Sequence, residues 1–281
     1  MTIKQLLAEG IRFLDERENS LLDCELLLAH VLGEEKEYLI RNAEQEVEDS
    51  LVELFKRYLN SLKDGEPLAY IVNAKEFFGI NFYVDKRVLI PRPETEHLVE
   101  KVLEYLSANF DGETLSVLDV GTGSGNIAIS VASHFADVEM EAVDIEEDAL
   151  EVARINAEQS GVDDRISFYQ SDLLQAVDGN FVVIVANLPY IGERRHRYVS
   201  AATEKYEPHS ALFGGENGLT LYERMFCELL EKDLDFKYLI GEFGFAQAEE
   251  MSKLLDEYFV GKWTIERDLA GIERLFVVKN I

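Results

Sequence analysis

The feature that most constrains the fold is the stretch Phe181–Tyr190, which reads FVVIVANLPY. Its first part is a run of β-branched apolar residues, the pattern of a strand that is buried on both faces of a sheet. Pro189 cannot donate to a sheet ladder and biases Leu188 towards an extended conformation, so the chain must leave the sheet there. Asn187 and Tyr190 are therefore predicted at the carboxyl end of a buried strand, the edge where open α/β sheets bind ligands.

Asn187 suits the activation of an amide or an aromatic amine, whose nitrogen is a poor nucleophile because its lone pair is delocalised. The side-chain oxygen of Asn187 and the carbonyl of Leu188 could each accept one N–H of such a group, and Tyr190 could pack on its flat face. Catalysis would come from positioning and from hydrogen bonds that strengthen as the nitrogen gains positive charge. The alternative is an ordinary strand-ending turn, since Asn and Pro are common turn residues.

Composition narrows the class of protein. The chain has 281 residues, of which 47% are hydrophobic, enough for a large core and too many for wholesale disorder. No apolar run approaches the length of a membrane span, and the start of the chain lacks a signal-peptide core, so we expect no membrane association and a cytoplasmic location. Cys24 and Cys227 are isolated, and the five histidines form no metal motif, so we expect reduced thiols and no metal.

The charge is strongly acidic. A net charge of −28, from 55 acidic and 27 basic residues, opposes binding to a polyanion, so no direct contact with nucleic acid is expected. A local basic patch could override this total. The one dense basic cluster, Arg194–Arg197, follows the Asn187 turn closely, and it is either a solvated loop or a cationic rim for an anionic partner.

The first part of the chain is predicted to be helical. Apolar residues recur at helical spacing in three runs between residue 1 and about residue 62, and acidic residues cover the other faces, which is typical of a small helical bundle. Gly33 is placed to end the second helix. No catalytic constellation stands out in this region, so it either docks the substrate or caps the rest of the protein.

A break in composition at Asp64–Pro67 marks the end of the bundle. The aromatic and β-branched residues that follow, including Tyr70–Val72 and Asn81–Val84 on either side of Gly79, predict a short β-hairpin. The predicted domains are residues 1–64, a helical substrate-docking domain, residues 65–90, a β-hairpin linker, and residues 91–281, the main domain.

Strands and helices alternate in the main domain, which predicts an α/β sheet with helices on both faces. The strand Leu115–Val120 leads into the glycine loop Gly121–Gly125 and an apolar helix, where glycines let a ligand approach the backbone and the helix N-terminus offers free N–H groups. The next strand ends at Asp144, the position of an acid that accepts ribose hydroxyls. A third ends at Ser171–Leu173, whose acid could receive an adenine amine while its leucine lies against the base. Each acid alone could be a cap or turn residue, but three such strand ends argue against chance.

The other elements of the main domain follow from the same patterns. Pro93 is placed near the start of a helix with acids in its first turn. After Tyr190 come about 20 residues without clear periodicity, a length typical of a lid. The last predicted elements are a helix over Leu221–Leu230, a strand at Tyr238–Ile240, a helix at Met251–Tyr258 and an antiparallel pair, Trp263–Arg267 with Glu273–Lys279.

These motifs together resemble the HemK/PrmC family, class I methyltransferases that use S-adenosylmethionine to methylate a glutamine side-chain amide in peptide chain release factors. The proline-rich segment around Arg92 is the most family-specific of them, and the glycine loop is the least. The motifs that carry the resemblance are, in family order, Gly65–Ile71, Leu89–Glu96, Asp119–Gly125, Ala142–Asp144, Ser171–Leu173, the Asn187 turn, Glu207–Pro208 with Gly214–Gly215, and Asp268–Gly271.

The resemblance implies a Rossmann-like, mostly parallel seven-stranded sheet behind an N-terminal helical bundle. It implies transfer of a methyl group from S-adenosylmethionine, giving S-adenosylhomocysteine, to N5 of the glutamine in the GGQ motif of release factors, in support of translation termination. We expect a monomer. By resemblance, the catalytic residue is Asn187, the cofactor is bound by Gly121, Thr122, Gly123, Ser124, Gly125, Asp144, Asp172, Leu173 and Asn187, and the substrate glutamine is bound by Asn187, Leu188, Pro189 and Tyr190.

The chain departs from the family's Asn-Pro-Pro-Tyr signature at Leu188. Leucine keeps the backbone carbonyl but loses the fixed φ of proline, so we expect an active enzyme with a looser turn, or a paralogue with another substrate. One alternative is a nucleic-acid adenine-N6 methyltransferase, which uses nearly the same turn on a flipped base. Another is a non-catalytic binding module with the same fold. The net charge disfavours the first, and the intact Asn187, Pro189 and Tyr190 disfavour the second.

Overall fold

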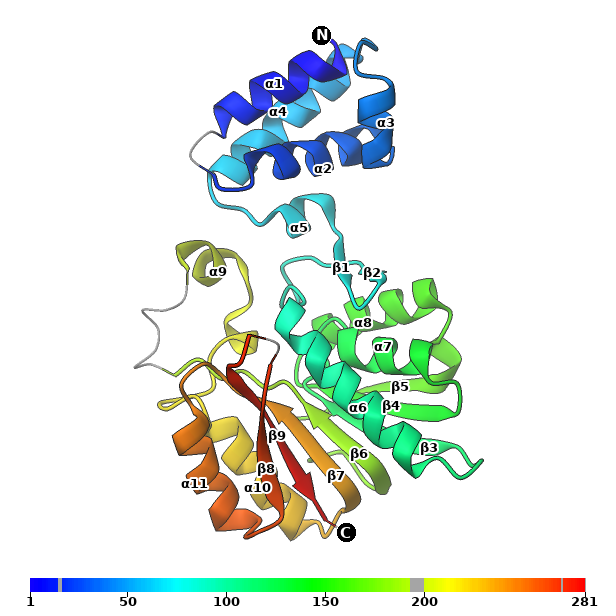
Figure 1. The fold of residues 1–281 in the computed structure, drawn as a ribbon, viewed down its shortest axis with the longest axis vertical. Coiled ribbons are helices and arrows are strands. Elements are labelled where there is room, and N and C mark those ends of the chain that lie inside the picture. The colour runs from blue at the N-terminus through cyan, green and yellow to red at the C-terminus, as the bar shows by residue number, and fades with distance from the viewer. Residues whose placement is uncertain (15–16, 193–199, 269, 281) are drawn as a thin grey trace. The chain divides into compact units, whose positions relative to one another are not determined.

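The computed structural model describes residues 1–14, 17–192, 200–268 and 270–280 (Figure 1). The chain divides into two compact units. One comprises Met1–Ala74 with Ala201–Tyr206, and the other comprises Lys75–Ser200 with Glu207–Ile281. In the part of the chain just defined, no helix is long and apolar enough to cross a membrane. The basic cluster Arg194–Arg197 lies outside the described residues.

The first unit is a helical bundle, as the spacing of its apolar residues predicts. Thr2 and Gln5 form a reciprocal capping box: the Gln5 N–H donates to Thr2 Oγ1 at 3.3 Å, and the Thr2 N–H donates to Gln5 Oε1 at 3.0 Å. Gly33 ends the second helix in the left-handed conformation. The helices are α1 (Ile3–Phe13), α2 (Ser20–Leu32), α3 (Lys36–Arg41), α4 (Asp49–Lys63), α5 (Leu68–Val72) and α9 (Ala201–Tyr206).

The core of the bundle is built from the longer helices α1, α2 and α4, which contribute the fully buried side chains of Ile3, Leu27 and Phe55. Gly10 lets these helices approach closely, since a Cβ atom there would lie 3.0 Å from Cys24 Sγ and 3.2 Å from the Phe55 ring. The short helices α3 and α9 do not appear among the predicted elements. Six residues are too few to establish a helical period.

The expectation of extended structure at Tyr70–Val72 is wrong, because these residues belong to α5. Pro67 stands at the N-cap of this helix, and Asn73 ends it with a φ of 51°, a left-handed conformation that Asn tolerates better than most residues. The β-hairpin itself is confirmed slightly later in the chain. It pairs β1 (Lys75–Phe77) with β2 (Ile80–Phe82) through a turn with positive φ at both Phe78 and Gly79.

The second unit contains the predicted seven-stranded, mostly parallel sheet. Its strand order is β5-β4-β3-β6-β7-β9-β8, with the first five strands parallel and β9 antiparallel to both of its neighbours. The order reverses at β3, whose neighbours are β4 and β6, and this switch point is where open α/β sheets bind ligands. The strands are β3 (Leu115–Val120), β4 (Val138–Asp144), β5 (Ile166–Gln170), β6 (Asn180–Ala186), β7 (Asp235–Glu242), β8 (Trp263–Arg267) and β9 (Glu273–Lys279).

Two helical layers cover the sheet (Figure 1). On one side, α7 contacts both α6 and α8, and these three helices contact strands β3 to β7, whereas α10 and α11 form a separate pair. Helices α10 and α11 pack on the face of the sheet that carries Leu118, Ile184 and Leu239. These three residues lie side by side on neighbouring strands, and the side chains before and after them point to the opposite face. The helices are α6 (Glu96–Asn109), α7 (Asn126–His134), α8 (Glu147–Ser160), α10 (Thr220–Glu231) and α11 (Ala248–Tyr258), with 3-10 turns at Pro93–Thr95, Asp163–Arg165 and His209–Ala211.

Candidate active site

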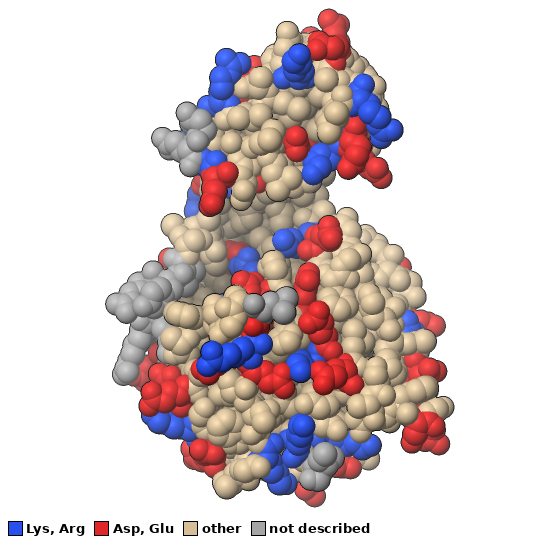
Figure 2. Space-filling view, viewed as in Figure 1, with Lys and Arg blue, Asp and Glu red and all other residues tan. Residues whose placement is uncertain are grey.

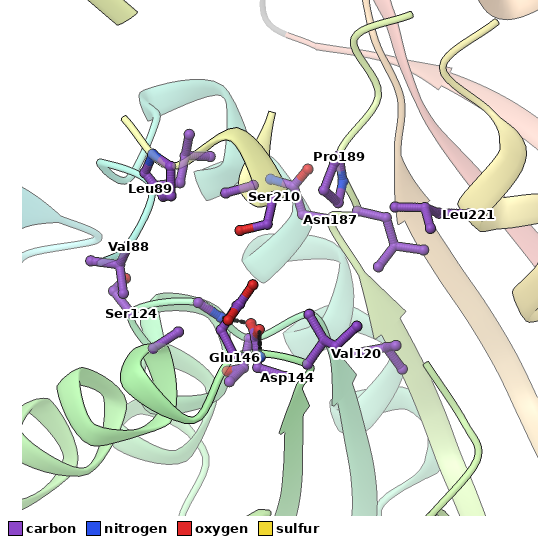
Figure 3. A pocket seen from close by; sticks show the side chains of 18 of the residues that line it. Val88, Leu89, Val120, Ser124, Asp144, Glu146, Asn187, Pro189, Ser210 and Leu221 are labelled. Atoms are coloured by element: carbon purple, nitrogen blue, oxygen red, sulfur yellow. Dashed lines mark hydrogen bonds between the residues drawn. The ribbon is translucent and has the colours of Figure 1, made fainter. Parts of the chain in front are cut away.

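A cavity of about 280 Å³ lies at the carboxyl ends of the central strands. Figure 3 shows Asn187 and Pro189 across this cavity from Asp144, Glu146 and Ser124. Ten of the residues predicted for the site line it: Gly121, Thr122, Gly123, Ser124, Asp144, Asp172, Leu173, Asn187, Leu188 and Pro189.

Gly125 and Tyr190, the other two residues predicted for the site, do not line the cavity. Gly125 is the N-cap of α7, with a φ of 80°. A Cβ atom there would lie 2.7 Å from Ile129 Cδ1 and 3.2 Å from Ala153 Cβ, so its role in the structure is close helix packing. Tyr190 places its hydroxyl 3.4 Å from Glu242 Oε1, and its backbone carbonyl accepts the Gln247 side-chain amide at 2.9 Å.

The glycine loop is held by its neighbour strand. The backbone N–H groups of Gly121 and Thr122 donate to the Val143 carbonyl at 2.8 and 2.9 Å. Gly121 and Gly123 have φ values of 76° and 56°, a region that favours glycine. A Cβ atom on Gly123 would have nothing within 4 Å, whereas one on Gly121 would lie 3.0 Å from Leu188 Cδ2. Gly123 thus leaves room beside the backbone for a ligand.

Asp144 joins the glycine loop to the end of β4. Its Oδ2 accepts the Gly123 N–H at 2.9 Å, and its Oδ1 accepts the Glu146 N–H at 3.0 Å. Burial raises the pKa of this carboxyl, while the two backbone donors lower it. An ionised carboxylate has roughly four lone-pair positions, so two remain for hydroxyl donors in the cavity.

Asp119, one residue before the end of β3, is completely buried. Its Oδ2 accepts the Thr122 hydroxyl at 2.7 Å and the Ala128 N–H at 3.3 Å. Its Oδ1 has no hydrogen-bond partner among the described residues. Burial, more than any other cause, raises the pKa of this carboxyl to about 7.

Asp172 forms an ion pair that sequence patterns did not predict. Its Oδ2 lies 2.9 Å from Arg224 Nη2, and Arg224 also lines the cavity from α10. The next residue, Leu173, has a φ of 50°, which turns the chain sharply after β5. Nothing in the local sequence marks Arg224, because its partner is 52 residues away in the chain.

The proline-rich segment before α6 is fixed by a buried acid. Glu207 accepts the Ile90 N–H at 3.2 Å and pairs with Arg92 Nη2 at 2.6 Å, and its side chain is 2% exposed. Arg92 and Pro208 both line the cavity. Two motifs that are far apart in the sequence, Leu89–Glu96 and Glu207–Pro208, therefore meet at one wall of the site.

Asn187 is held from behind by side chains of other elements. Its Nδ2 donates to Thr95 Oγ1 at 3.0 Å, and the Thr95 hydroxyl donates to Glu242 Oε2 at 2.8 Å. The Leu188 N–H points to the Tyr222 hydroxyl at 3.4 Å. Sequence patterns did not predict Thr95, Glu242 or Tyr222 for the site. Glu242 carried one usable signal, because it ends an apolar strand in the same way as Asp144.

The surroundings of the cavity fit S-adenosylmethionine. Gly123 leaves open the position that a side chain would fill, and Asp144 keeps free lone pairs at the ribose position of such folds. Asp119 does not line the cavity but holds Thr122 of the glycine loop, and its Oδ1 has no partner among the described residues. The sheet order, the antiparallel β9, the glycine loop and Asp144 together define a class I S-adenosylmethionine-dependent methyltransferase.

Comparisons with known proteins agree with this class and also identify the family. Residues 5–72 match the PrmC N-terminal domain, and residues 97–212 match the methyltransferase small domain. The release factor glutamine methyltransferase of Clostridium acetobutylicum is 38% identical over 98% of this chain and 97% of its own length, and that of Bacillus subtilis is 34% identical over 97% and 96%. The chain belongs to the release factor glutamine methyltransferase family.

Solved structures support the fold alone. The hMettl16 catalytic domain in complex with MAT2A 3'UTR hairpin 6 superposes with a TM-score of 0.58 at 15% identity, over 73% of this chain and 77% of that chain. The N-terminal domain of human METTL16 in complex with SAH gives a TM-score of 0.53 at 17% identity, with the same coverage.

Substituting Asp119→Asn should flatten the dependence of stability on pH. The raised pKa means that folded Asp119 keeps its proton up to about pH 7, whereas in the unfolded chain it ionises near pH 4. Its stabilising contribution is therefore complete below about pH 4 and is lost as the pH rises through 7. We expect wild type to lose on the order of 2 kcal/mol more than Asp119→Asn between pH 5 and pH 8.

The measurement is urea unfolding followed by fluorescence of Trp263, the one tryptophan, which lies in β8 of the same unit. The matched control is Asp178→Asn, because that side chain is 94% exposed and should leave the wild-type profile unchanged. Parallel pH profiles for wild type and Asp119→Asn would show that Asp119 ionises normally.

Proposed function

We propose that this protein transfers a methyl group from S-adenosylmethionine to the side-chain N5 of the glutamine in the GGQ motif of a peptide chain release factor. The names of relatives that match nearly the whole chain support this substrate. The main observation in support of this reaction is the hydrogen bonding of the Asn187 side chain at the cavity wall. The described residues give its Nδ2 a partner, Thr95, and give its Oδ1 none.

The turn provides two acceptors for one amide. Asn187 Oδ1 and the Leu188 carbonyl would each accept one N–H of the glutamine side chain, which directs the nitrogen lone pair away from both acceptors. S-adenosylmethionine, when bound, supplies an electrophilic methyl group. As the nitrogen gains positive charge both hydrogen bonds strengthen, so the turn stabilises the transition state more than the ground state. No general base is required, because the extra proton can leave to water after the transfer.

We assign the cofactor to the opposite wall. The backbone of Gly121–Ser124 would lie against it, Asp144 would accept its ribose hydroxyls, and Asp172 with Leu173 would receive the adenine. The ion pair with Arg224 occupies Asp172 Oδ2 and leaves Oδ1 for the adenine amine. We further propose that the enzyme acts as a monomer in the cytoplasm, where release factors work.

Nucleic acid is a weaker candidate substrate. The net charge is −28, and Figure 2 shows basic side chains interspersed with acidic ones on the face in view. Such a distribution would repel phosphate groups over most approaches. An adenine-containing RNA hairpin is therefore the proper negative control in a methyl-transfer assay.

Asp144→Ala should weaken the binding of S-adenosylmethionine. Each lost hydrogen bond to an ionised acceptor costs roughly 1.5–3 kcal/mol, and the backbone donors of Gly123 and Glu146 lose their partner as well. Titration calorimetry measures the affinity, and Asp144→Asn, which keeps one acceptor oxygen, should fall between wild type and Asp144→Ala. Wild-type affinity in a folded Asp144→Ala protein would remove Asp144 from the site.

Substitutions in the turn should separate its two acceptors. Asn187→Ala removes a side-chain acceptor and should slow single-turnover methyl transfer to a release factor by about a hundredfold or more. Leu188→Pro keeps the carbonyl, so it should be far less damaging to turnover. It should lower stability slightly, because the buried Leu188 side chain and the long bond from its N–H to Tyr222 are lost.

Three outcomes of this assay would count against the proposal. The first is methylation of the RNA hairpin in preference to the release factor. The second is equal labelling of a release factor whose GGQ glutamine has been replaced. The third is a folded Asn187→Ala enzyme with wild-type turnover, which would show that the Asn187 side chain does not contribute to methyl transfer. Circular dichroism and cofactor affinity serve as the controls for folding.

We also propose that the helical bundle docks the release factor. Leu22 and Leu26 on α2 are 44% and 39% exposed and lie one turn apart, so together they present an apolar surface to solvent. Leu22→Lys combined with Leu26→Lys should raise KM for the release factor about tenfold or more and leave the affinity for S-adenosylmethionine unchanged. Val260→Lys, at a 77% exposed position of the other unit, is the matched control. An unaltered KM would make the bundle a structural cap.

A further inference from the structure

Two hydrogen bonds, one of them fully buried, connect the Asn187 side chain to a carboxyl group inside the second unit. Asn187 Nδ2 donates to Thr95 Oγ1, and the Thr95 hydroxyl donates to Glu242 Oε2, at 3.0 and 2.8 Å. Thr95 and Glu242 are each 1% exposed. Thr95 lies in the 3-10 turn before α6, and Glu242 ends β7, the strand that pairs with β6. Three separate elements thus meet behind one amide.

The direction of these bonds follows from the number of protons available. A threonine hydroxyl has a single hydrogen, and an ionised carboxylate can only accept. When Glu242 takes that hydrogen, Thr95 can only accept from Asn187, so the NH₂ group of the amide must face Thr95. Rotating the amide by a half-turn would set two acceptors 3.0 Å apart and remove the hydrogen bond.

We propose that Glu242 is a positioning residue that acts through Thr95 to fix which end of the Asn187 amide faces the cavity. With the NH₂ group held by Thr95, the cavity receives the oxygen, so the site accepts nitrogen groups that donate and rejects groups that only accept. The amide-nitrogen substrate in this inference rests on the proposed function. The orientation of Asn187 rests only on the two hydrogen bonds described above and is independent of the proposed function.

The charge on Glu242 decides whether the amide stays fixed. A protonated Glu242 could donate to Thr95, whose own hydrogen would then turn towards Asn187 Oδ1 and allow the reversed amide. Burial raises the pKa of Glu242 to about 7, and the Thr95 hydroxyl opposes that shift. The productive orientation is therefore expected above about pH 7 and is progressively lost below it.

Other polar groups surround Glu242 and set its titration. The Tyr190 hydroxyl, from the loop after β6, lies 3.4 Å from Glu242 Oε1. Tyr222, from α10, hydrogen-bonds to the Glu242 backbone carbonyl, and its hydroxyl and the Glu242 carboxyl also interact electrostatically. The charged groups that act on this site are Arg274 on β9, which favours the ionised form, Glu94 in the 3-10 turn, which opposes it, and Arg92, which acts on the neighbouring Tyr190.

The first test is the pH profile of single-turnover methyl transfer to a release factor at saturating S-adenosylmethionine. The wild-type rate should fall below about pH 7. Thr95→Val removes the hydroxyl and should lower the plateau rate about tenfold or more, with cofactor affinity unchanged. Thr95→Ser keeps the hydroxyl and should recover most of the loss. Glu242→Gln still offers an acceptor but cannot ionise, so its acid limb should disappear.

The second test needs no substrate. The side-chain NH₂ signals of Asn187, assigned by their absence in Asn187→Ala, should titrate with a midpoint near pH 7 in wild type. They should stop titrating in Glu242→Gln and shift in Thr95→Val. A wild-type enzyme that leaves release factors unmethylated would refute the proposed function, while these signals would still decide the orientation of Asn187.

Either of two results would overturn the inference. One is a Thr95→Val enzyme with the wild-type rate and the wild-type pH profile. The other is a set of Asn187 signals that ignore substitution at Glu242. The Thr95 pair keeps the test decisive even if Glu242→Gln fails to fold, because threonine, serine and valine differ little in size and only valine lacks the hydroxyl.

Discussion

The site depends on the hydrogen bonds of carboxylates that lie, buried or half-buried, at the ends of sheet strands. Asp119, Asp144 and Glu242 stand at or next to the last residue of β3, β4 and β7. Taking an ionised carboxyl out of water is costly unless donors surround it, so each one recruits groups from a neighbouring loop. Asp119 recruits Thr122, Asp144 recruits the backbone of Gly123, and Glu242 recruits Thr95.

This demand for donors explains how a sheet with regular strands produces an irregular but defined rim. The loops between strands and helices bury apolar side chains such as Leu173, Val177 and Leu188, and their backbones need hydrogen-bond partners as well. The carboxylates fix them by hydrogen bonds, and the pKa values of Asp119 and Glu242, raised to about 7, reveal how incompletely those donors offset burial. Two of the three carboxyl groups that hold the rim, Asp119 and Glu242, are thus close to losing or gaining a proton near neutral pH.

Much of the fold could be predicted because its signals are local. Strands such as Val182–Val185, helix ends such as Gly33, and the acid at Asp144 are each visible within a few residues. The prediction of a strand at Tyr70–Val72 is wrong because aromatic and β-branched residues favour strands. The residues there form a helix whose two ends are set by Pro67 and Asn73.

The buried supports of the site could not be predicted in the same way. Thr95 and Glu242 are 147 residues apart in the chain, and Asp172 and Arg224 are 52 apart, so no local pattern links them. Only the fold brings the partners together. The acids that face the cavity carried a signal in their position at strand ends, whereas a threonine in a proline-rich segment carried none of its own.

The contact between Gly121 and Leu188 gives the rim a mechanical property. A single added carbon on Gly121 would lie 3.0 Å from Leu188 Cδ2, so the glycine loop and the Leu188 side chain are close neighbours. A change at position 188 that reshapes the turn would also alter this contact, so it would act on both the proposed substrate turn and the proposed cofactor loop.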